Sequence, residues 1–480
     1  MEKVIRNKGP LSGPVDLLLE FAGFVLEDEY VDPHETMNRI LSASKKLGVK
    51  SAAVGFTRSR DQMVRFSNNS ITVVNSWQTE VPTVYLASNG KRAACRIEER
   101  DGAEFENVVK ELADSMKVTP RGDVYFGLPK GPFTYSDVEG TYDKRLAEID
   151  TGLIDAAKNA INSAKKEGAQ RVSGVVVAGS WEHFVITSAG AEGSSKGTGI
   201  EITVRAFATD DATGQGISIA TNLSRFDPGG AGATAGTIAK RARGATAGES
   251  GKYSIVLGPA IFADLIDRVA DSASAYTVDL GFSFFPDSLG KKVASEKLTL
   301  HDNGRLPNGP GSIALDDEGY PTGETHLITK GTLENYLHTS YTAAKYNARL
   351  TGSAQFDAGV AGMIPAPRNL IVEPGEQRFE DLIDKAQTGL YITNNWYTRF
   401  QNYQTGDFST ICRDGVFEIK NGKLGNPVKG LRVSDNMIRI LQSIEALSNE
   451  RHWIRWWEVP TPTLTPYVLV REVGITTANK

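Results

Sequence analysis

The stretch from residue 389 to residue 429 constrains the fold of this chain more than any other. Its strongest signal is the turn Asn421-Gly422, because Asn-Gly between apolar runs is the best short-range cue for a β-hairpin. Residues 416–419 precede this turn and Val428 follows it, while residues 390–392 have the composition of a further short strand. The stretch therefore predicts antiparallel β-structure towards the C-terminal end of the chain.

Residues 394–400 and 405–409, which lie between these strands, are predicted as loops. Loops held by a rigid sheet often carry functional groups, and Asn, Tyr, Trp and Arg side chains suit the binding of peptide backbone and carboxylates. Candidate residues for binding a peptide or a partner are Asn394, Asn395, Trp396, Tyr397, Arg399, Tyr403, Asp407, Ser409 and Arg413. A purely structural hydrogen-bond network in the same loops is the alternative, and the sequence leaves both open.

Helical and strand periodicities alternate along the rest of the chain. Helices are expected from Pro33 to about residue 47, at 105–116 and at 146–167, with strands at 52–58, 63–67, 71–75, 81–87, 93–97, 172–178, 183–187 and 199–209. From residue 251 onward strands dominate, with helices at Pro259–Ser272, 379–386 and 437–447. This pattern predicts an α+β fold. Its N-terminal domains combine helices with antiparallel sheet, and its C-terminal domain is mainly β, with a curled or barrel-like antiparallel sheet.

The length of 480 residues exceeds that of one ordinary core, so two or three domains are expected. We divide the chain into an N-terminal arm (1–31), an N-terminal α+β domain (32–120), a middle α+β domain (121–248) and a C-terminal β-rich domain (249–480).

Charge and cysteine content narrow the function classes. The formal net charge is −5 and the basic residues do not cluster, which argues against nucleic acid as the main partner. The apolar run at residues 15–26 is too short and too charged for a membrane span. Two distant cysteines, Cys95 and Cys412, indicate a reducing compartment rather than a disulfide framework. We therefore expect a cytoplasmic protein without a membrane or nucleic-acid partner.

Four motifs resemble ligand sites but favour structural roles. Asp316-Asp317-Glu318 offers three carboxylates, yet adjacent residues on a strand face opposite sides, so we favour a turn over a cation site. The six histidines include no pair at the i, i+4 spacing of a helical zinc site. The glycines of residues 227–236 lack the order of a phosphate-binding loop, and a helix is expected only from residue 238. The tryptophans of residues 453–457 are predicted on a helix face that is buried or faces a partner.

Several short motifs, in order and spacing, resemble the TldD/PmbA family, and specifically its PmbA or TldE branch. Each motif is weak alone, but the ordered set is specific and covers about residues 35–440. The set comprises 64–71 (VRFSNNSI), the strand at 201–205, 287–291 (DSLGK), 298–302 (LTLHD), 316–319 (DDEG), 330–333 (KGTL), 351–354 (TGSA), 405–409 (TGDFS) and 421–423 (NGK) with Pro427-Val428.

This resemblance implies a heterodimeric metalloprotease, formed by TldD and TldE, that cleaves unfolded or small peptides. It also implies that the TldD branch binds zinc through a His-Glu-x-x-x-His helix at the start of its C-terminal domain and a cysteine near its end. The corresponding helix here is Pro259–Ser272, and residues 251–295 contain neither histidine nor glutamate. The expectation is a non-catalytic subunit without a metal of its own. It would pair with a zinc-bearing TldD-like paralogue or with a second copy of itself.

Two other function classes remain open at this point. A metal-independent hydrolase would use Asp407, Ser409, Cys412 or Arg413, whose side chains include a hydroxyl and a thiol. A homodimeric peptide-binding scaffold would need no catalytic group.

Overall fold

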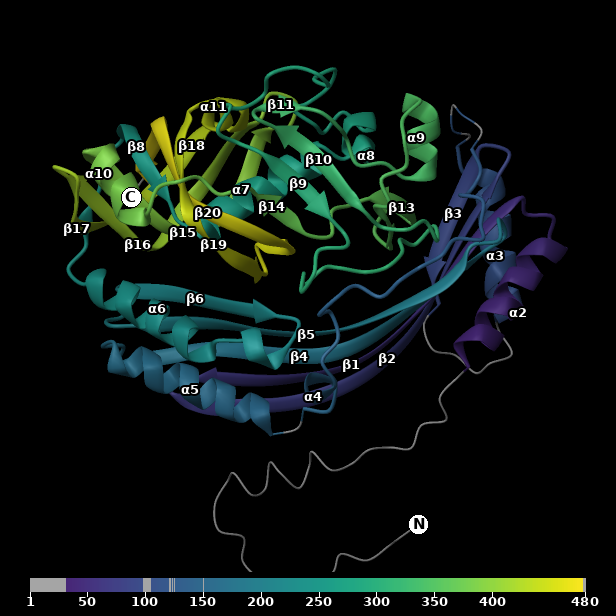
Figure 1. The fold of residues 1–480 in the computed structure, drawn as a ribbon, viewed down its shortest axis with the longest axis horizontal. Helices are drawn as coiled ribbons and strands as arrows, with labels where there is room; N and C mark the ends of the chain where they lie inside the picture. Colours follow the sequence, from purple (N-terminus) through teal and green to yellow (C-terminus); the bar gives the residue numbers. More distant parts are fainter. Residues whose placement is uncertain are drawn as a thin grey trace, which may run out of the picture.

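The computed structural model describes residues 32–97, 105–120, 122, 124, 126–149 and 151–477, so the predicted arm at 1–31 lies outside the described residues. A six-stranded antiparallel sheet, here called the N-terminal sheet, runs along the molecule in the order β3-β2-β1-β4-β5-β6 (Figure 1). Its strands are β1 (Ser51–Ser67), β2 (Ser70–Ser88), β3 (Lys91–Arg96), β4 (Arg171–Thr187), β5 (Glu192–Phe207) and β6 (Thr213–Ala220). Because β1 pairs with β4, one sheet joins segments from either side of residue 120.

Helices cover the two ends of the N-terminal sheet (Figure 1). At one end lie α2 (Pro33–Lys46) and α3 (Phe105–Val118), and at the other lie α5 (Gly152–Lys166) and α6 (Pro228–Arg241), with the short helices α4 (Lys144–Ala147) and η1 (Leu223–Arg225). Each pair of helices covers a hydrophobic core, and strand β1 contributes to both. Val54 and Phe56 belong to the first core, beside α2 and α3, and Val64 and Phe66 belong to the second core, beside α5 and α6. Long strands therefore link two small hydrophobic cores into one body.

The N-terminal part of the structure corrects four predicted boundaries. The strands predicted at 52–58 and 63–67 form a single strand, β1, those at 71–75 and 81–87 form β2, and those at 172–178 and 183–187 form β4. Between the two cores, polar residues of β1 find partners within the sheet, as in the ion pair of Arg58 with Glu80 at 2.7 Å. The polar residues between the two predicted strands therefore continue β1 and do not interrupt it. The helix predicted at 146–167 is two helices, because α4 ends at Ala147 and α5 begins at Gly152.

The glycine-rich run at residues 228–236 is helical, whereas the sequence predicted a helix only from residue 238. Its small residues bring backbones together: a Cβ at Gly232 would lie 2.2 Å from the carbonyl oxygen of Ala160 in α5. On the sheet side, a Cβ at Gly216 of β6 would lie 1.9 Å from the carbonyl oxygen of Ala231. The glycines thus allow α6 to pack closely between α5 and the sheet.

The rest of the chain forms a 12-stranded sheet, here called the C-terminal sheet, that curls around the buried helix α7 (Figure 1). Its strands are β7 (Thr246–Ala247), β8 (Gly251–Leu257), β9 (Leu300–Asn303), β10 (Glu324–Thr329), β11 (Thr332–Leu333), β14 (Leu370–Val372), β15 (Thr388–Asn402), β16 (Asp407–Lys420), β17 (Lys423–Lys429), β18 (Leu431–Asn436), β19 (Ile444–Trp456) and β20 (Val459–Thr477). A separate hairpin joins β12 (Ala354–Asp357) and β13 (Gly362–Pro365). The helices are α7 (Pro259–Ser272), α8 (Ala275–Asp279), α9 (Ser340–Tyr346), α10 (Phe379–Ala386) and α11 (Met437–Gln442).

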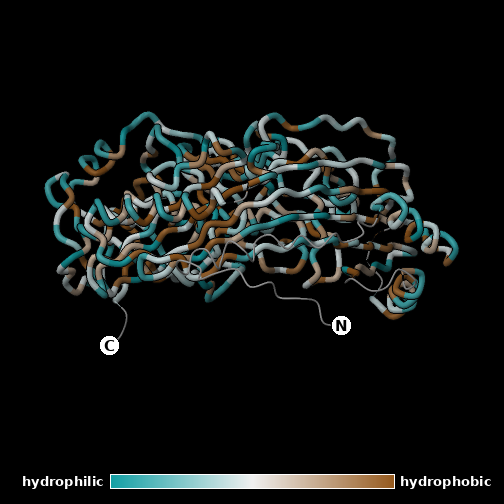
Figure 2. Tube along the Cα trace, turned by 90° about the horizontal axis from the view of Figure 1, so that it is seen from below, coloured by the Kyte–Doolittle hydropathy of each residue, from teal (hydrophilic) through white to brown (hydrophobic). Residues whose placement is uncertain are grey.

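This arrangement confirms the predicted α+β class, with a mainly β C-terminal part and a curled sheet. In Figure 2 hydrophobic segments lie mainly inside the molecule, and hydrophilic ones predominate along its outline. Across the described ranges, no helix combines the length and apolar character needed to cross a membrane.

The predicted hairpin at Asn421-Gly422 is confirmed, because both residues have positive φ and Lys420 pairs with Lys423. The loop predicted at 394–400 is wrong, since these residues belong to β15. The loop predicted at 405–409 is a turn only up to Gly406, since β16 begins at Asp407. The helix predicted at 437–447 ends at Gln442, and the tryptophans lie on and beside the long hairpin of β19 and β20. Ile454 and Trp456 are both buried and lie two residues apart, which is the spacing of side chains on one face of a strand and not of a helix.

Candidate functional site

A buried polar network joins β15 to α7, the helix at the start of the C-terminal sheet. Asp264 of α7 is fully buried and accepts hydrogen bonds from Asn395 Nδ2 and Thr398 Oγ1, both at 2.5 Å. The predicted site residue Asn395 is also fully buried. It therefore fixes β15 against α7 instead of facing solvent.

Arg268 lies close to all three carboxylates of α7. Its guanidinium lies 3.5 Å from Asp264, 4.0 Å from Asp267 and 3.4 Å from Asp271. Burial raises the pKa of Asp267 to about 7, the charge of Asp271 adds to the rise, and Arg268 opposes it. The positive charge that these carboxylates need is thus supplied from within the helix.

An aromatic patch lies on the outer side of this network, formed by Trp396, Tyr397 and Trp457 with Arg399 and Arg413 beside them. Tyr397 has a φ of 58° at an irregularity in the pairing of β15 with β16, which turns its ring outward. Tyr397 is 44% exposed and Trp457 62% exposed.

The rings of the aromatic patch contact one another and carry two cations. The ring centroids of Trp396 and Tyr397 are 4.5 Å apart, and those of Tyr397 and Trp457 are 6.3 Å apart. The guanidinium of Arg413 lies 3.9 Å from the Trp396 ring centroid, and that of Arg399 lies 4.9 Å from the Tyr397 ring centroid. Exposed rings beside guanidinium groups can stack against apolar side chains and bind carboxylates.

The other predicted site residues lie apart from this patch. Asn394 is buried between the two sheets and donates hydrogen bonds to Gln215 and Asp414. Tyr403 packs on Phe282 and Phe400 instead. The structure therefore brings together Trp396, Tyr397, Arg399 and Arg413, and separates them from Asn394 and Tyr403.

The groups considered for a metal-independent hydrolase are engaged elsewhere. Asp407 accepts hydrogen bonds from Thr405 at 2.6 Å and from Asn436 at 2.9 Å. The Ser409 hydroxyl accepts from Gln401 at 3.0 Å and from Arg432 at 3.4 Å, and these contacts include no base. Burial raises the pKa of Cys412 to about 12, which keeps its thiol protonated.

Sequence reasoning missed Asp264, Trp457 and Glu458. Glu458, in the turn between β19 and β20, accepts a hydrogen bond from the backbone N–H of Tyr397 at 2.9 Å. Trp457 was visible as part of a tryptophan motif, but it was expected on a helix face that is buried or faces a partner, whereas it lies exposed beside a β-hairpin. Asp264 carried no signal, since a single acidic residue in a helix is ordinary. Its partners Asn395 and Thr398 lie more than a hundred residues away.

The acidic motif at residues 316–318 forms a turn, as expected. Asp316 accepts hydrogen bonds from the backbone N–H groups of Glu318 and Tyr320 at 3.0 and 2.8 Å. Asp317 lies 2.9 Å from His183, while Glu318 accepts from Ser340 N at 2.8 Å at the start of α9. The three carboxylates thus point to three different partners and do not converge on a cation.

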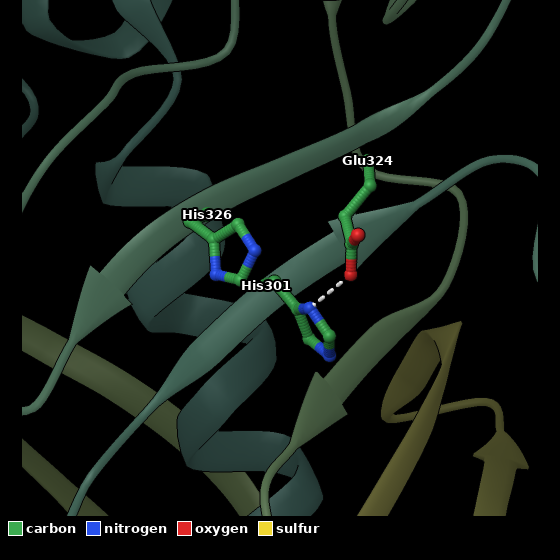
Figure 3. Close-up of side chains that lie close together, drawn as sticks. All are labelled: His301, Glu324 and His326. Carbon is green, nitrogen blue, oxygen red and sulfur yellow. Dashed lines mark ion pairs between the residues drawn. The ribbon is translucent and has the colours of Figure 1, made fainter.

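A different set of side chains does converge, on strands β9 and β10 (Figure 3). His301 of β9 stands directly opposite His326 of β10, and Glu324 lies two residues before His326 on the same face. One potential ligand atom from each lies within 4.8 Å of the others, so these three residues could hold a metal ion. Burial lowers the pKa of His301, against the opposing effect of Glu324 and Glu373.

Known proteins similar in sequence are metalloproteases. A metalloprotease of Methanocaldococcus jannaschii is 29% identical over 205 residues, which is 42% of this chain and 44% of the relative. The metalloprotease PmbA of Escherichia coli O157:H7 is 28% identical over 204 residues, or 42% of each chain. The matched region spans less than half the length of these curated relatives.

Solved structures share the fold over nearly the whole chain. A protein described as a candidate modulator of a DNA gyrase from Thermotoga maritima has a TM-score of 0.80 at 24% identity. TldE from Thermococcus kodakarensis has a TM-score of 0.80 at 18% identity. Each comparison covers 92% of this chain and 100% of the other.

Family profiles match two consecutive regions of this chain. Residues 142–243 match the PmbA/TldA metallopeptidase central domain, and residues 250–477 match the PmbA/TldA metallopeptidase C-terminal domain. Together these regions hold most of the second core of the N-terminal sheet, apart from Val64 and Phe66 of β1, and all of the C-terminal sheet except β7. The chain therefore belongs to the TldD/PmbA family of metallopeptidases.

Proposed function

We propose that this chain is the non-catalytic, TldE-like subunit of a heterodimeric metalloprotease that acts in the cytoplasm on unfolded or small peptides. A TldD-like paralogue supplies the zinc and the catalytic groups, and this chain completes the chamber that holds the peptide. The observation that carries the proposal is α7, because this helix has neither histidine nor glutamate where the TldD branch has its zinc-binding motif.

The metal that the family name implies does not fit α7 in this chain. The carboxylate of Asp264 is already taken by Asn395 and Thr398. Arg268 then places a permanent positive charge among the remaining carboxylates of the helix. A cation would have to displace or repel that guanidinium, so we assign no catalytic step to α7.

The aromatic patch is the surface that we assign to peptide holding. Its rings and guanidinium groups offer stacking and carboxylate contacts with little demand on sequence, which suits unfolded substrates. The Asp264 network and the contact of Glu458 with Tyr397 hold the patch rigid from behind, so little conformational freedom is lost on binding.

The test combines this chain with the TldD-like paralogue from the same genome. We expect neither this chain alone nor its mixture with an unrelated protein to cleave unfolded casein, whereas the paired chains form a heterodimer by light scattering and cleave it. Replacing both Tyr397 and Trp457 by alanine should raise KM about 10-fold with a smaller change in kcat. Tyr403→Ala is the matched control, because Tyr403 is 49% exposed but lies outside the patch.

Three outcomes would contradict this assignment. Cleavage by the isolated chain that is lost in Ser409→Ala would establish the hydrolase alternative. A stable homodimer that binds peptide and ignores the paralogue would establish the scaffold alternative. Equal effects of the patch variants and Tyr403→Ala on KM would show that the patch does not bind the peptide. This result would not contradict the proposed heterodimer.

A further inference from the structure

Two neighbouring strands place three potential metal ligands on one face of the C-terminal sheet (Figure 3). The antiparallel register sets His301 opposite His326 and Glu324 opposite Asn303, so both histidines and Glu324 share that face. The imidazole centroids of His301 and His326 are 5.1 Å apart. Because the backbone ladder holds the three residues side by side, side-chain rotation alone can bring their ligand atoms onto one ion.

His301 is 8% exposed, yet neither of its ring nitrogens has a hydrogen-bond partner of acceptable geometry. Both nitrogens face carboxylates: Nδ1 lies 2.5 Å from Glu324 and Nε2 lies 3.2 Å from Glu373. A neutral imidazole carries one N–H, so it can donate to only one of the two carboxylates. The other nitrogen directs a lone pair at an anion, a repulsion that a bound cation would remove once the two groups move apart to about 2 Å each from the ion.

We propose that His301 Nδ1, His326 and Glu324 bind a divalent transition-metal ion, with Zn²⁺ as the preferred occupant. Glu373 then orients His301 through the Nε2–H group, which is the arrangement of carboxylate, histidine and metal found in many metal sites. Arg451 in turn lies 3.8 Å from the second oxygen of Glu373 and holds that carboxylate. The ion would also neutralise the charge of Glu324 and Glu373 beside a buried ring.

The donor set decides the class of metal. Two imidazoles and one carboxylate suit zinc and other first-row transition metals, whereas Ca²⁺ and Mg²⁺ prefer oxygen ligands alone. Glu324 and His326 are exposed, so the remaining coordination positions face solvent. This proposal departs from the sequence expectation that the chain holds no metal of its own, and it is independent of the TldD-like partner and of α7.

The test uses the full chain alone, stripped with a chelator and titrated with Zn²⁺ in a calorimeter near neutral pH. We expect one bound zinc per chain, and a Co²⁺-loaded form with visible ligand-field absorption. His326→Ala and Glu324→Gln should each weaken zinc binding more than about 10-fold, and Glu373→Gln should weaken it by about 10-fold. These side chains are solvent-accessible, so circular dichroism should show an intact fold in each variant.

His34→Ala is the matched control, because His34 lies 3.7 Å from Glu192 in an exposed pair to which the described part of the chain adds no third ligand. It should leave zinc affinity and the Co²⁺ spectrum unchanged. The proposal is overturned if the stripped chain binds no zinc, if binding survives unchanged in His326→Ala and Glu324→Gln, or if His34→Ala weakens it equally. None of these results bears on heterodimer formation or peptide cleavage, so the two proposals can fail separately.

Discussion

Among single residues, Asp317 is a carboxylate whose protonation at low pH should destabilise the folded state. Burial raises its pKa, but the hydrogen bond and charge of His183, together with Arg368, outweigh burial and lower the pKa to about 2. A depressed pKa means that the ionised carboxylate stabilises the folded state above its unfolded pKa, near 4. This contribution is lost as pH falls from there towards 2.

We expect Asp317→Asn to lower the free energy of unfolding by about 2 kcal/mol at neutral pH, the equivalent of this pKa shift. The difference from the wild type should shrink as pH falls below about 4. Urea unfolding followed by fluorescence at several pH values would measure it. Glu192→Gln is the control, since its pair with His34 is exposed and should contribute almost nothing. A difference that stayed constant down to pH 3 would contradict the assigned role.

The histidines show why single residues are hard to interpret from sequence. The i, i+4 criterion is valid for a helix, and on that criterion all six histidines are unremarkable. His301 and His326 meet because β9 and β10 pair in one register, and a shift of one residue would separate them. Their proximity is thus a property of strand pairing, which spacing along the chain does not reveal.

At the scale of elements, the packing of α6 makes a sharp prediction. A Cβ at Gly232 would lie 2.2 Å from a backbone oxygen of α5, which cannot move without shifting the helix. A Cβ at Gly229 would meet side-chain atoms instead, those of Asn159 at 3.2 Å and of Ser163 at 3.5 Å. We expect Gly232→Ala to destabilise the protein by roughly 1–3 kcal/mol. Gly229→Ala should be neutral or slightly stabilising, because alanine favours the helix. Thermal unfolding of both variants is the measurement, and equal melting temperatures would contradict this packing.

Elements with a strong local signal could be predicted from sequence, and those defined by distant partners could not. The helix Pro259–Ser272 and the Asn421-Gly422 hairpin follow from a helix-initiating proline with apolar periodicity and from a turn that needs positive φ. Residues 394–400 looked like a loop because they are polar. They are a strand because Asp264 and Asp414 satisfy those polar groups from other elements. Periodicity and turn signals therefore predicted the fold class, while the site depends on contacts between residues that are distant in sequence.

At the scale of the whole molecule, the C-terminal sheet contacts the N-terminal sheet at several places, and one of these junctions lies at β5 and β6. The link is partly buried: Asp414 of β16 accepts hydrogen bonds from Thr213 at 2.7 Å, pairs with Arg205 at 3.0 Å and also accepts from Asn394. Its side chain is completely buried. The same carboxylate thus ties β15 and β16, which carry much of the aromatic patch, to the N-terminal sheet.

Removing that carboxylate should weaken this junction. In Asp414→Ala the guanidinium of Arg205 and the amide of Asn394 lose their buried acceptor, and we expect a loss of about 3–5 kcal/mol in the free energy of unfolding. Calorimetry should then show a lower melting temperature for Asp414→Ala. Lys429→Ala is the matched control, because Lys429 pairs with Asp211 across the same junction at 2.7 Å but in solvent, and it should leave the transition unchanged. If both variants unfold at the same temperature, the junction is held by apolar packing such as that of Ile217 against Trp456, and not by Asp414.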